Sequence, residues 1–162
     1  MAKRRVFLTY HHWGEQHVID EFIRKFGEHW EFFSDSSRSD ATDREDAEEL
    51  SQACREAIEG TSVTIVMIGR QTGCRNFVDW ELWHTLQKQH GLLAISRPDF
   101  DDSLGCLPNR LVENGKSGYA KWYPYPSSDY VVRFFIEEAC DADKNKIDNS
   151  RERMKKSTSC CL

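Results

Sequence analysis

One stretch decides the fold: Ser62-Val63-Thr64-Ile65-Val66-Met67-Ile68. It is rich in β-branched side chains and almost unbroken in hydrophobicity, which is the pattern of a central parallel strand covered on both faces. A short polar loop follows, then a helix predicted over residues 77–89 and a further strand predicted over residues 91–96. A strand, a helix and a strand in this order predict a right-handed crossover between two parallel strands.

The chain before this strand also alternates between predicted strands and predicted helices. Residues 5–10 form a first predicted strand, and residues 15–26 carry apolar side chains at helical spacing. A short strand is predicted over residues 31–34, and the polar residues 35–43 are expected to form a mobile loop. Residues 44–59 carry apolar positions at the spacing of a second helix.

The chain after the strand over residues 91–96 is less regular. Its Gly, Pro and Asn content predicts irregular structure over residues 104–120, followed by an edge strand over residues 121–124. A last helix is predicted over residues 128–139. One domain is therefore expected over residues 1–141, with residues 142–162 as a polar, frayed tail.

Alternating strands and helices predict an α/β, flavodoxin-like three-layer sandwich with a parallel five-stranded sheet. A length of 162 residues fits one domain, and 39% apolar residues are enough for a core. The expected strand order is 2-1-3-4-5, whose switch point lies between the first and third strands. Open α/β sheets bind their ligands at this point, outside the carboxyl ends of the strands.

The composition disfavours several classes of partner. Lys and Arg supply 22 positive charges against 27 negative ones, whereas a nucleic-acid partner requires a clustered basic surface. No stretch approaches the ~18 apolar residues of a membrane span, and the basic start runs directly into a strand pattern. The six cysteines include no CxxC pair, which favours reduced thiols. We therefore expect a cytoplasmic protein without nucleic-acid or membrane partners.

Glu81 is the candidate catalytic residue. It lies one turn into the helix that follows the third strand, beside Trp80 and close to the predicted switch point. Its angle of roughly 60° from the apolar stripe of that helix predicts a carboxylate that borders the core without pointing into it. Position alone leaves two interpretations open, a functional carboxylate and an ordinary exposed helical glutamate.

His11 and His12 follow the first strand at the same crevice. Imidazoles bind hydrogen-bond partners, protons or metals near neutral pH, but a polar pair that caps the next helix is an equal alternative. No metal site is expected, because the E-x-x-H pattern of Glu81–His84 occurs once and carboxylate-bridged sites need two copies. Glycine-rich phosphate motifs are also missing. Cys74 and Cys106 have no identifiable histidine partner, so packing is their expected role.

Four segments are distinctive in combination: Arg4–His12, Gly60–Val66, Phe77–Leu82 and Asn114–Tyr123. In this order, across about residues 3 to 153, they resemble segments of bacterial TIR-like proteins, among them the TIR proteins of Thoeris antiphage systems. Many relatives have serine where this chain has Thr9, a change that keeps the hydroxyl.

The resemblance implies an enzyme that splits NAD+ at the nicotinamide–ribose bond, with NAD+ as substrate and no cofactor. It implies a signal nucleotide, cyclic or histidine-conjugated ADP-ribose, that activates an effector protein, and a homo-oligomer is expected. Glu81 matches the catalytic glutamate of the family. Loop position adds candidate substrate contacts, which are flat aromatic surfaces or polar groups near the switch point: Phe7, Tyr10, His11, His12, Asp35 and Trp80.

Two other functions share this topology. A catalytically silent TIR-like adaptor would act by protein contacts through the loop over residues 35–43. A receiver-like phosphorylation module would need an acidic pair at the end of the first strand, where His11 and His12 stand instead.

Overall fold

The computed structural model describes residues 3–35, 49–98 and 106–158. Its sheet has five strands, each parallel to its neighbours, in the order β2-β1-β3-β4-β5. This arrangement confirms the flavodoxin-like order 2-1-3-4-5. The strands are β1 (Arg4–Thr9), β2 (Trp30–Phe33), β3 (Val63–Ile68), β4 (Gly91–Ser96) and β5 (Lys121–Tyr123).

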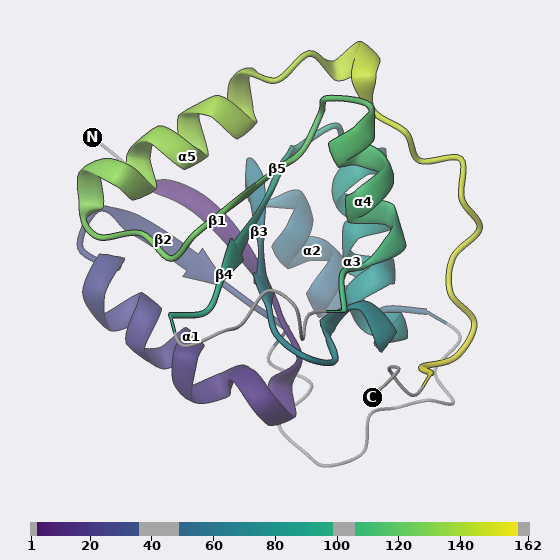
Figure 1. Cartoon of the computed structure of the whole chain (residues 1–162), viewed down its shortest axis with the longest axis horizontal. Helices are drawn as coiled ribbons and strands as arrows, with labels where there is room; N and C mark the ends of the chain where they lie inside the picture. Colours follow the sequence, from purple (N-terminus) through teal and green to yellow (C-terminus); the bar gives the residue numbers. More distant parts are fainter. Residues whose placement is uncertain (1–2, 36–48, 99–105, 159–162) are drawn as a thin grey trace.

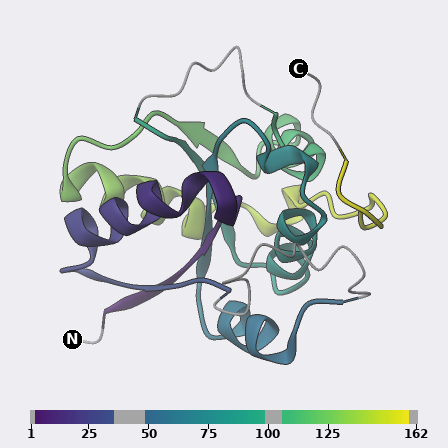
Figure 2. The ribbon, with the colours of Figure 1, turned by 90° about the horizontal axis from the view of Figure 1, so that it is seen from below.

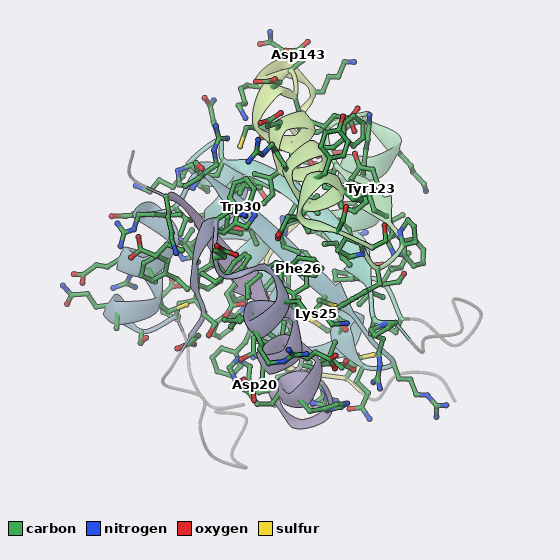
Figure 3. All side chains as sticks on the ribbon, turned by 90° about the vertical axis from the view of Figure 1, so that its left-hand side faces the viewer. Asp20, Lys25, Phe26, Trp30, Tyr123 and Asp143 are labelled. Carbon is green, nitrogen blue, oxygen red and sulfur yellow. The ribbon has the colours of Figure 1, made fainter. Side chains whose placement is uncertain are left out.

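Helices cover both faces of the sheet and complete a three-layer sandwich (Figure 1). Figure 2 shows the same division from below, and Figure 3 looks onto the layer that contains α1 and α5. One layer consists of α1 (His12–Phe26) and α5 (Asp129–Asp141). The other consists of α2 (Gln52–Glu59), α3 (Asn76–Gln87) and α4 (Asn109–Lys116). Within the described ranges, no helix has both the length and the apolar character to cross a membrane.

The core follows from the alternation of side chains along the central strands. Every residue of β3 is buried, because helices cover both of its faces. Val63, Ile65 and Met67 pack into the core beneath α1 and α5, whereas Val66 and Ile68 pack beneath α3 and α4. A third cluster joins β1, α2 and α3 and consists of Phe7, Leu50, Cys54, Ile58, Phe77 and Trp80.

Helix α2 is shorter than the sequence predicts. Residues 49–51 are not helical, and the helix begins at Gln52. Ser51 is its N-cap, since its hydroxyl oxygen accepts a hydrogen bond from the backbone N–H of Cys54 at 3.2 Å. The predicted loop after Asp35 and the first part of the predicted helix lie in residues 36–48, outside the described residues.

Helix α4 corrects the prediction of irregular structure over residues 104–120. Its sequence contains Asn114 and Gly115, which have low helix propensity, and it follows Pro108 directly. The buried amide of Asn114 offsets that propensity, because its Nδ2 donates hydrogen bonds to the carbonyl oxygens of Arg110 and Asp148 at 2.8 Å each. Tertiary hydrogen bonds that the local sequence does not encode therefore stabilise this helix.

The C-terminal segment is not frayed over its described part. Residues 147–158, which we call the strap, run along the layer of α3 and α4 (Figure 1). The fully buried guanidinium of Arg110 holds it by donating to the side-chain oxygen of Asn149 and to the carbonyl oxygens of Arg151 and Glu152. The same guanidinium forms an ion pair with Asp79 of α3 at 2.9 Å.

One cysteine differs from the prediction of reduced thiols. Cys74 is disulfide-bonded, whereas Cys54, Cys106 and Cys140 are in the thiol form. Cys74 lies in a short 3-10 helix, η2 (Thr72–Cys74), between β3 and α3.

Candidate active site

An ion pair lies beside the residue that follows β3. The carboxylate of Glu15, on α1, is 3% exposed and accepts hydrogen bonds from the guanidinium of Arg97 at 3.2 Å to each oxygen. Gly69 ends the central strand directly beneath it, and a side-chain methyl there would overlap the Glu15 carboxylate. A larger residue at this position would therefore displace the Glu15 carboxylate from its place beside Arg97. The sequence analysis selected neither member of the ion pair.

Glu81 lies in a buried polar cluster. Its carboxylate is 1% exposed, and the Cys54 thiol lies 3.8 Å from its Oε1. Asp35, which follows β2 and is 4% exposed, completes the cluster. One side-chain ligand atom from each of the three residues lies within 4.8 Å of the others. The cluster thus joins the helix that carries Glu81, helix α2 and the carboxyl end of an edge strand.

The burial of Glu81 corrects the prediction that it only borders the core. That prediction used the apolar stripe of α3 alone, which faces β3 and β4. Helix α2 packs against a second side of α3 through Cys54 and Ile58, and this contact encloses the glutamate. The packing of two helices on each other, and not the amphipathic pattern of one, determines its exposure.

The cluster favours positive charge. Two carboxylates this close in a buried setting repel one another, and a cationic group placed beside them relieves the repulsion. Among the described residues, Asp35, Cys54 and Glu81 also form the group whose geometry could hold a metal ion. Thiolate and carboxylate oxygen together suit a zinc-type ion. The E-x-x-H argument from sequence did not detect this group.

Tyr10 lies next to the cluster. Its hydroxyl is buried and donates a hydrogen bond to Oε1 of Gln16 at 2.9 Å. Burial raises the pKa of the Tyr10 hydroxyl, and the charge of Glu81 raises it further. The phenol is therefore protonated at neutral pH and is a hydrogen-bond donor. Its ring stacks on His12, with 4.2 Å between ring centroids.

The two histidines have different positions in the fold. His11 is the N-cap residue of α1, and its carbonyl oxygen accepts the backbone N–H of Glu15 at 3.0 Å. Its side chain makes no capping hydrogen bond. His12 is the first residue of the helix and stacks on Tyr10. Both side chains are partly exposed.

The aromatic candidates Phe7 and Trp80 are packed against protein. Phe7 is fully buried, Trp80 is 3% exposed, and both belong to the cluster between β1, α2 and α3. The indole N–H of Trp80 donates a hydrogen bond to the carbonyl oxygen of Met154 in the strap at 2.6 Å. Stacking of a nucleotide on either ring requires a rearrangement, and their role as substrate contacts stays a prediction.

A charged network connects the strap to the residues just before α2. Glu49 accepts hydrogen bonds from Arg153 at 2.7 Å and from the imidazole Nε2 of His84 at 3.1 Å. Partial burial raises the pKa of the Glu49 carboxyl, but these hydrogen bonds outweigh it and lower the pKa to about 2. The Arg153 guanidinium also lies over the Trp83 ring, 5.0 Å from its centroid. Helix α3, the strap and the entrance to α2 are therefore linked.

A cavity of about 480 Å³ opens at the carboxyl ends of β4 and β5, on the same edge of the sheet as Glu81. The indole of Trp122 is 39% exposed there, and its N–H donates to the hydroxyl of Ser96 at 2.7 Å. Arg97 lines the cavity and also pairs with Glu15, so this ion pair borders the cavity. The lining residues are Ser96, Arg97, Pro98, Trp122, Tyr123, Pro124 and Tyr125.

Comparison with known proteins identifies the family. Residues 7–102, more than half of the chain, match the family described as "Thoeris protein ThsB, TIR-like domain". The chain belongs to this family. This ThsB TIR-like region contains Glu81 and every other residue that the sequence analysis selected as a candidate contact.

A curated relative of this ThsB TIR-like chain comes from Bacillus cereus (strain MSX-D12) and is named "Putative cyclic ADP-D-ribose synthase ThsB1". The two are 34% identical over 118 residues, which cover 68% of this chain and 59% of the relative. The chain thus spans about three fifths of the length of the curated relative that it matches.

Proposed function

We propose that this ThsB-family chain cleaves NAD+ at the nicotinamide–ribose bond and makes a signal nucleotide derived from ADP-ribose. The product is a cyclic ADP-ribose or a histidine conjugate, and it activates an effector protein in antiphage defence. The name of the Bacillus cereus relative supports the cyclic product. The buried cluster of Glu81, Asp35 and Cys54 at the carboxyl edge of the sheet is the observation that carries the proposal.

The chemistry of NAD+ cleavage suits this cluster. The bond between C1′ of the ribose and the nicotinamide nitrogen breaks, and its electron pair leaves with the neutral nicotinamide. The ribose then carries positive charge like an oxocarbenium ion, which a nearby carboxylate stabilises as in glycosidases. Glu81 supplies this carboxylate. Asp35 brings a second carboxyl group beside Glu81, and an ionised carboxylate in this cluster favours a cationic ribose over a neutral one.

The neighbours of Glu81 have separate roles in this proposal. The Cys54 thiol contacts Oε1 of Glu81 and fixes the direction of the carboxylate, so Cys54 is a positioning residue. Tyr10 offers a protonated phenol and Asp35 a second carboxylate for the ribose hydroxyls. His11 and His12, at the start of α1, are placed for the diphosphate.

Access to Glu81 requires a conformational change, because the carboxylate is 1% exposed. A trigger such as self-assembly of several chains would open the cluster to NAD+.

The same burial supports a second candidate, a catalytically silent TIR-like adaptor. In that case the cluster of Asp35, Cys54 and Glu81 is a structural element, and defence depends on contacts between proteins. Deletion of residues 36–43 would then abolish defence, whereas Glu81→Gln would leave it intact.

Nucleotides extracted from phage-challenged cells separate the two candidates. Mass spectrometry should detect a product derived from ADP-ribose with the wild type and with Glu59→Gln, an exposed carboxylate that serves as the matched control. The product should be missing with Glu81→Gln. Equal product levels in all three strains, or phage resistance without any such product, would overturn the enzymatic proposal.

A further inference from the structure

Thr9, the last residue of β1, carries a buried hydroxyl group. The side chain is 1% exposed. Among the described residues, its Oγ1 has no hydrogen-bond partner. Most buried polar atoms of folded proteins are hydrogen-bonded, because an unpaired one loses its bonds to water and gains none in return. The Thr9 hydroxyl therefore lowers the stability of the fold, and a role in function would explain its presence.

The pairing of β1 with β3 shows which face of the sheet the Thr9 side chain occupies. Side chains alternate along a strand, so Thr9 shares a face with Phe7, which packs against α2 and α3. Thr9 is also the register partner of Val66, which packs beneath α3. The Thr9 hydroxyl therefore lies on the face of the sheet that α2 and α3 cover, and Glu81 belongs to this helical layer.

Thr9 and Glu81 are also level with each other along the strand direction. Thr64, the register partner of Phe7, shares a hydrogen bond with Thr85 of α3 at 2.7 Å. Glu81 lies one turn before Thr85, and α3 runs back against the strands, so Glu81 is about 6 Å nearer to their carboxyl ends. Thr9 lies two residues beyond Phe7 in the same direction, which is about 6 to 7 Å. The two side chains thus face the same region.

The electrostatics of Tyr10, the next residue, agree with this placement. Burial raises the pKa of the Tyr10 hydroxyl, and the charge of Glu81 raises it further. Coulomb interactions weaken with distance, so this effect requires the Glu81 carboxylate to lie near the end of β1.

Building on the proposed cleavage of NAD+, we propose that the Thr9 hydroxyl hydrogen-bonds to a hydroxyl of the nicotinamide ribose, as a further substrate contact beside Glu81. A threonine hydroxyl both donates and accepts hydrogen bonds, as a ribose hydroxyl does, and β-branching restricts its rotamers. A phosphate group fits less well, because the Glu81 carboxylate would repel it. Both side chains are 1% exposed, so the contact forms only when the cluster opens.

Thermal unfolding separates a functional hydroxyl from a structural one. Thr9→Val keeps the shape of the side chain and removes its unpaired hydroxyl, so the melting temperature of the full-length protein should rise by about 2 to 4 °C. Thr64→Val is the matched control on the neighbouring strand. It removes a hydroxyl that is bonded to Thr85 and should lower the melting temperature.

Nicotinamide release measures the contact with the substrate. Under the condition in which the wild type is active, Thr9→Val should lower kcat/KM for NAD+ by about five- to tenfold, as loss of one hydrogen bond does. Thr9→Ser keeps the hydroxyl and should retain most of the rate. The assay is repeated with two NAD+ analogues, which lack the 2′- or the 3′-hydroxyl of the nicotinamide ribose. With one of them, Thr9→Val and the wild type should have the same kcat/KM, because the partner of the Thr9 hydroxyl is missing.

With an active wild type, any of three results would overturn the role of Thr9 and leave the proposed function intact. The first is a Thr9→Val protein with the wild-type kcat/KM. The second is a Thr9→Val protein that melts below the wild type, because its hydroxyl is then structural. The third is an equal loss with NAD+ and with both analogues, because Thr9 then contacts neither ribose hydroxyl. A wild type that releases no nicotinamide contradicts the proposed function itself, and the role of Thr9 falls with it.

Discussion

Sγ of Cys54 lies 3.8 Å from Oε1 of Glu81, and each of the two side chains is 1% exposed. The thiol comes from α2 and the carboxylate from α3, so the packing of these two helices brings the two groups into contact. A thiol is a weak hydrogen-bond donor, but in a buried site it still selects one orientation of its partner.

Replacement of Cys54 tests this positioning role. Cys54→Ala should lower the rate of nicotinamide release from NAD+ by roughly fivefold, because loss of one hydrogen bond of ~1 kcal/mol changes a rate by that factor. Cys54→Ser, which keeps a donor, should retain most of the rate. Equal losses in both variants would assign Cys54 to packing alone.

The Arg110–Asp79 ion pair should be essential for stability. Arg110→Met leaves the Asp79 carboxylate in a mostly buried site without its guanidinium and removes the donors to the strap. The free energy of unfolding, measured by urea titration, should fall by roughly 3 to 5 kcal/mol. The double variant Asp79→Asn/Arg110→Met should be less destabilised than the sum of its single variants. Strict additivity would contradict a direct pair.

Two glycines provide a matched comparison. Gly69→Ala places a methyl against the Glu15 carboxylate and should destabilise the protein by roughly 1 to 3 kcal/mol, as overpacking does. Gly115→Ala in helix α4 meets only the carbonyl oxygen of Ala120, at an ordinary van der Waals distance of 3.9 Å, and should stabilise the helix by up to about 1 kcal/mol. Thermal unfolding of both variants measures the two effects. A Gly69→Ala protein as stable as the wild type would show that the Glu15–Arg97 ion pair is not held against residue 69.

The Glu49 carboxyl should make the stability of the folded protein depend on pH. Its pKa is lowered from 4.5 to about 2 in the folded protein, so its contribution is fully present above pH 4.5 and is lost as the pH falls from 4.5 toward 2. Urea unfolding at pH 6, 4.5 and 3 should show a steeper loss for the wild type than for Glu49→Gln. Parallel curves would indicate that Arg153 and His84 do not hold this carboxylate in solution.

The sheet could be predicted from the sequence alone, because the apolar patterns that indicate its strands are local and strong. The run Val63–Ile68 is buried on both faces, and such a run indicates a central parallel strand without knowledge of its neighbours. The flavodoxin-like strand order was then selected because it suits alternating strands and helices in a chain of this length, and the structure confirms it. Glu81 was also found, from its place after β3 together with the resemblance of the segment Phe77–Leu82 to TIR-like proteins.

The remainder of the site depends on contacts between distant segments. Cys54 shares a helical face with Leu50 and Ile58, but nothing local indicates that this face packs on the helix of Glu81. The pairing of Glu15 with Arg97 joins residues 82 positions apart. Helix α4 and the strap were missed for the same reason, because the hydrogen bonds of Asn114 and Arg110 that stabilise them are tertiary.

Release of nicotinamide from NAD+ is the most direct test of the role of Glu81. The wild type, Glu81→Gln and the control Glu59→Gln are compared as purified protein and in extracts of phage-infected cells. We expect release by the wild type and by Glu59→Gln, and a rate at least about 100-fold lower for Glu81→Gln, as for removal of an electrostatic stabiliser of the transition state. Release by Glu81→Gln at the wild-type rate, or no release by the wild type under either condition, would contradict the proposed function.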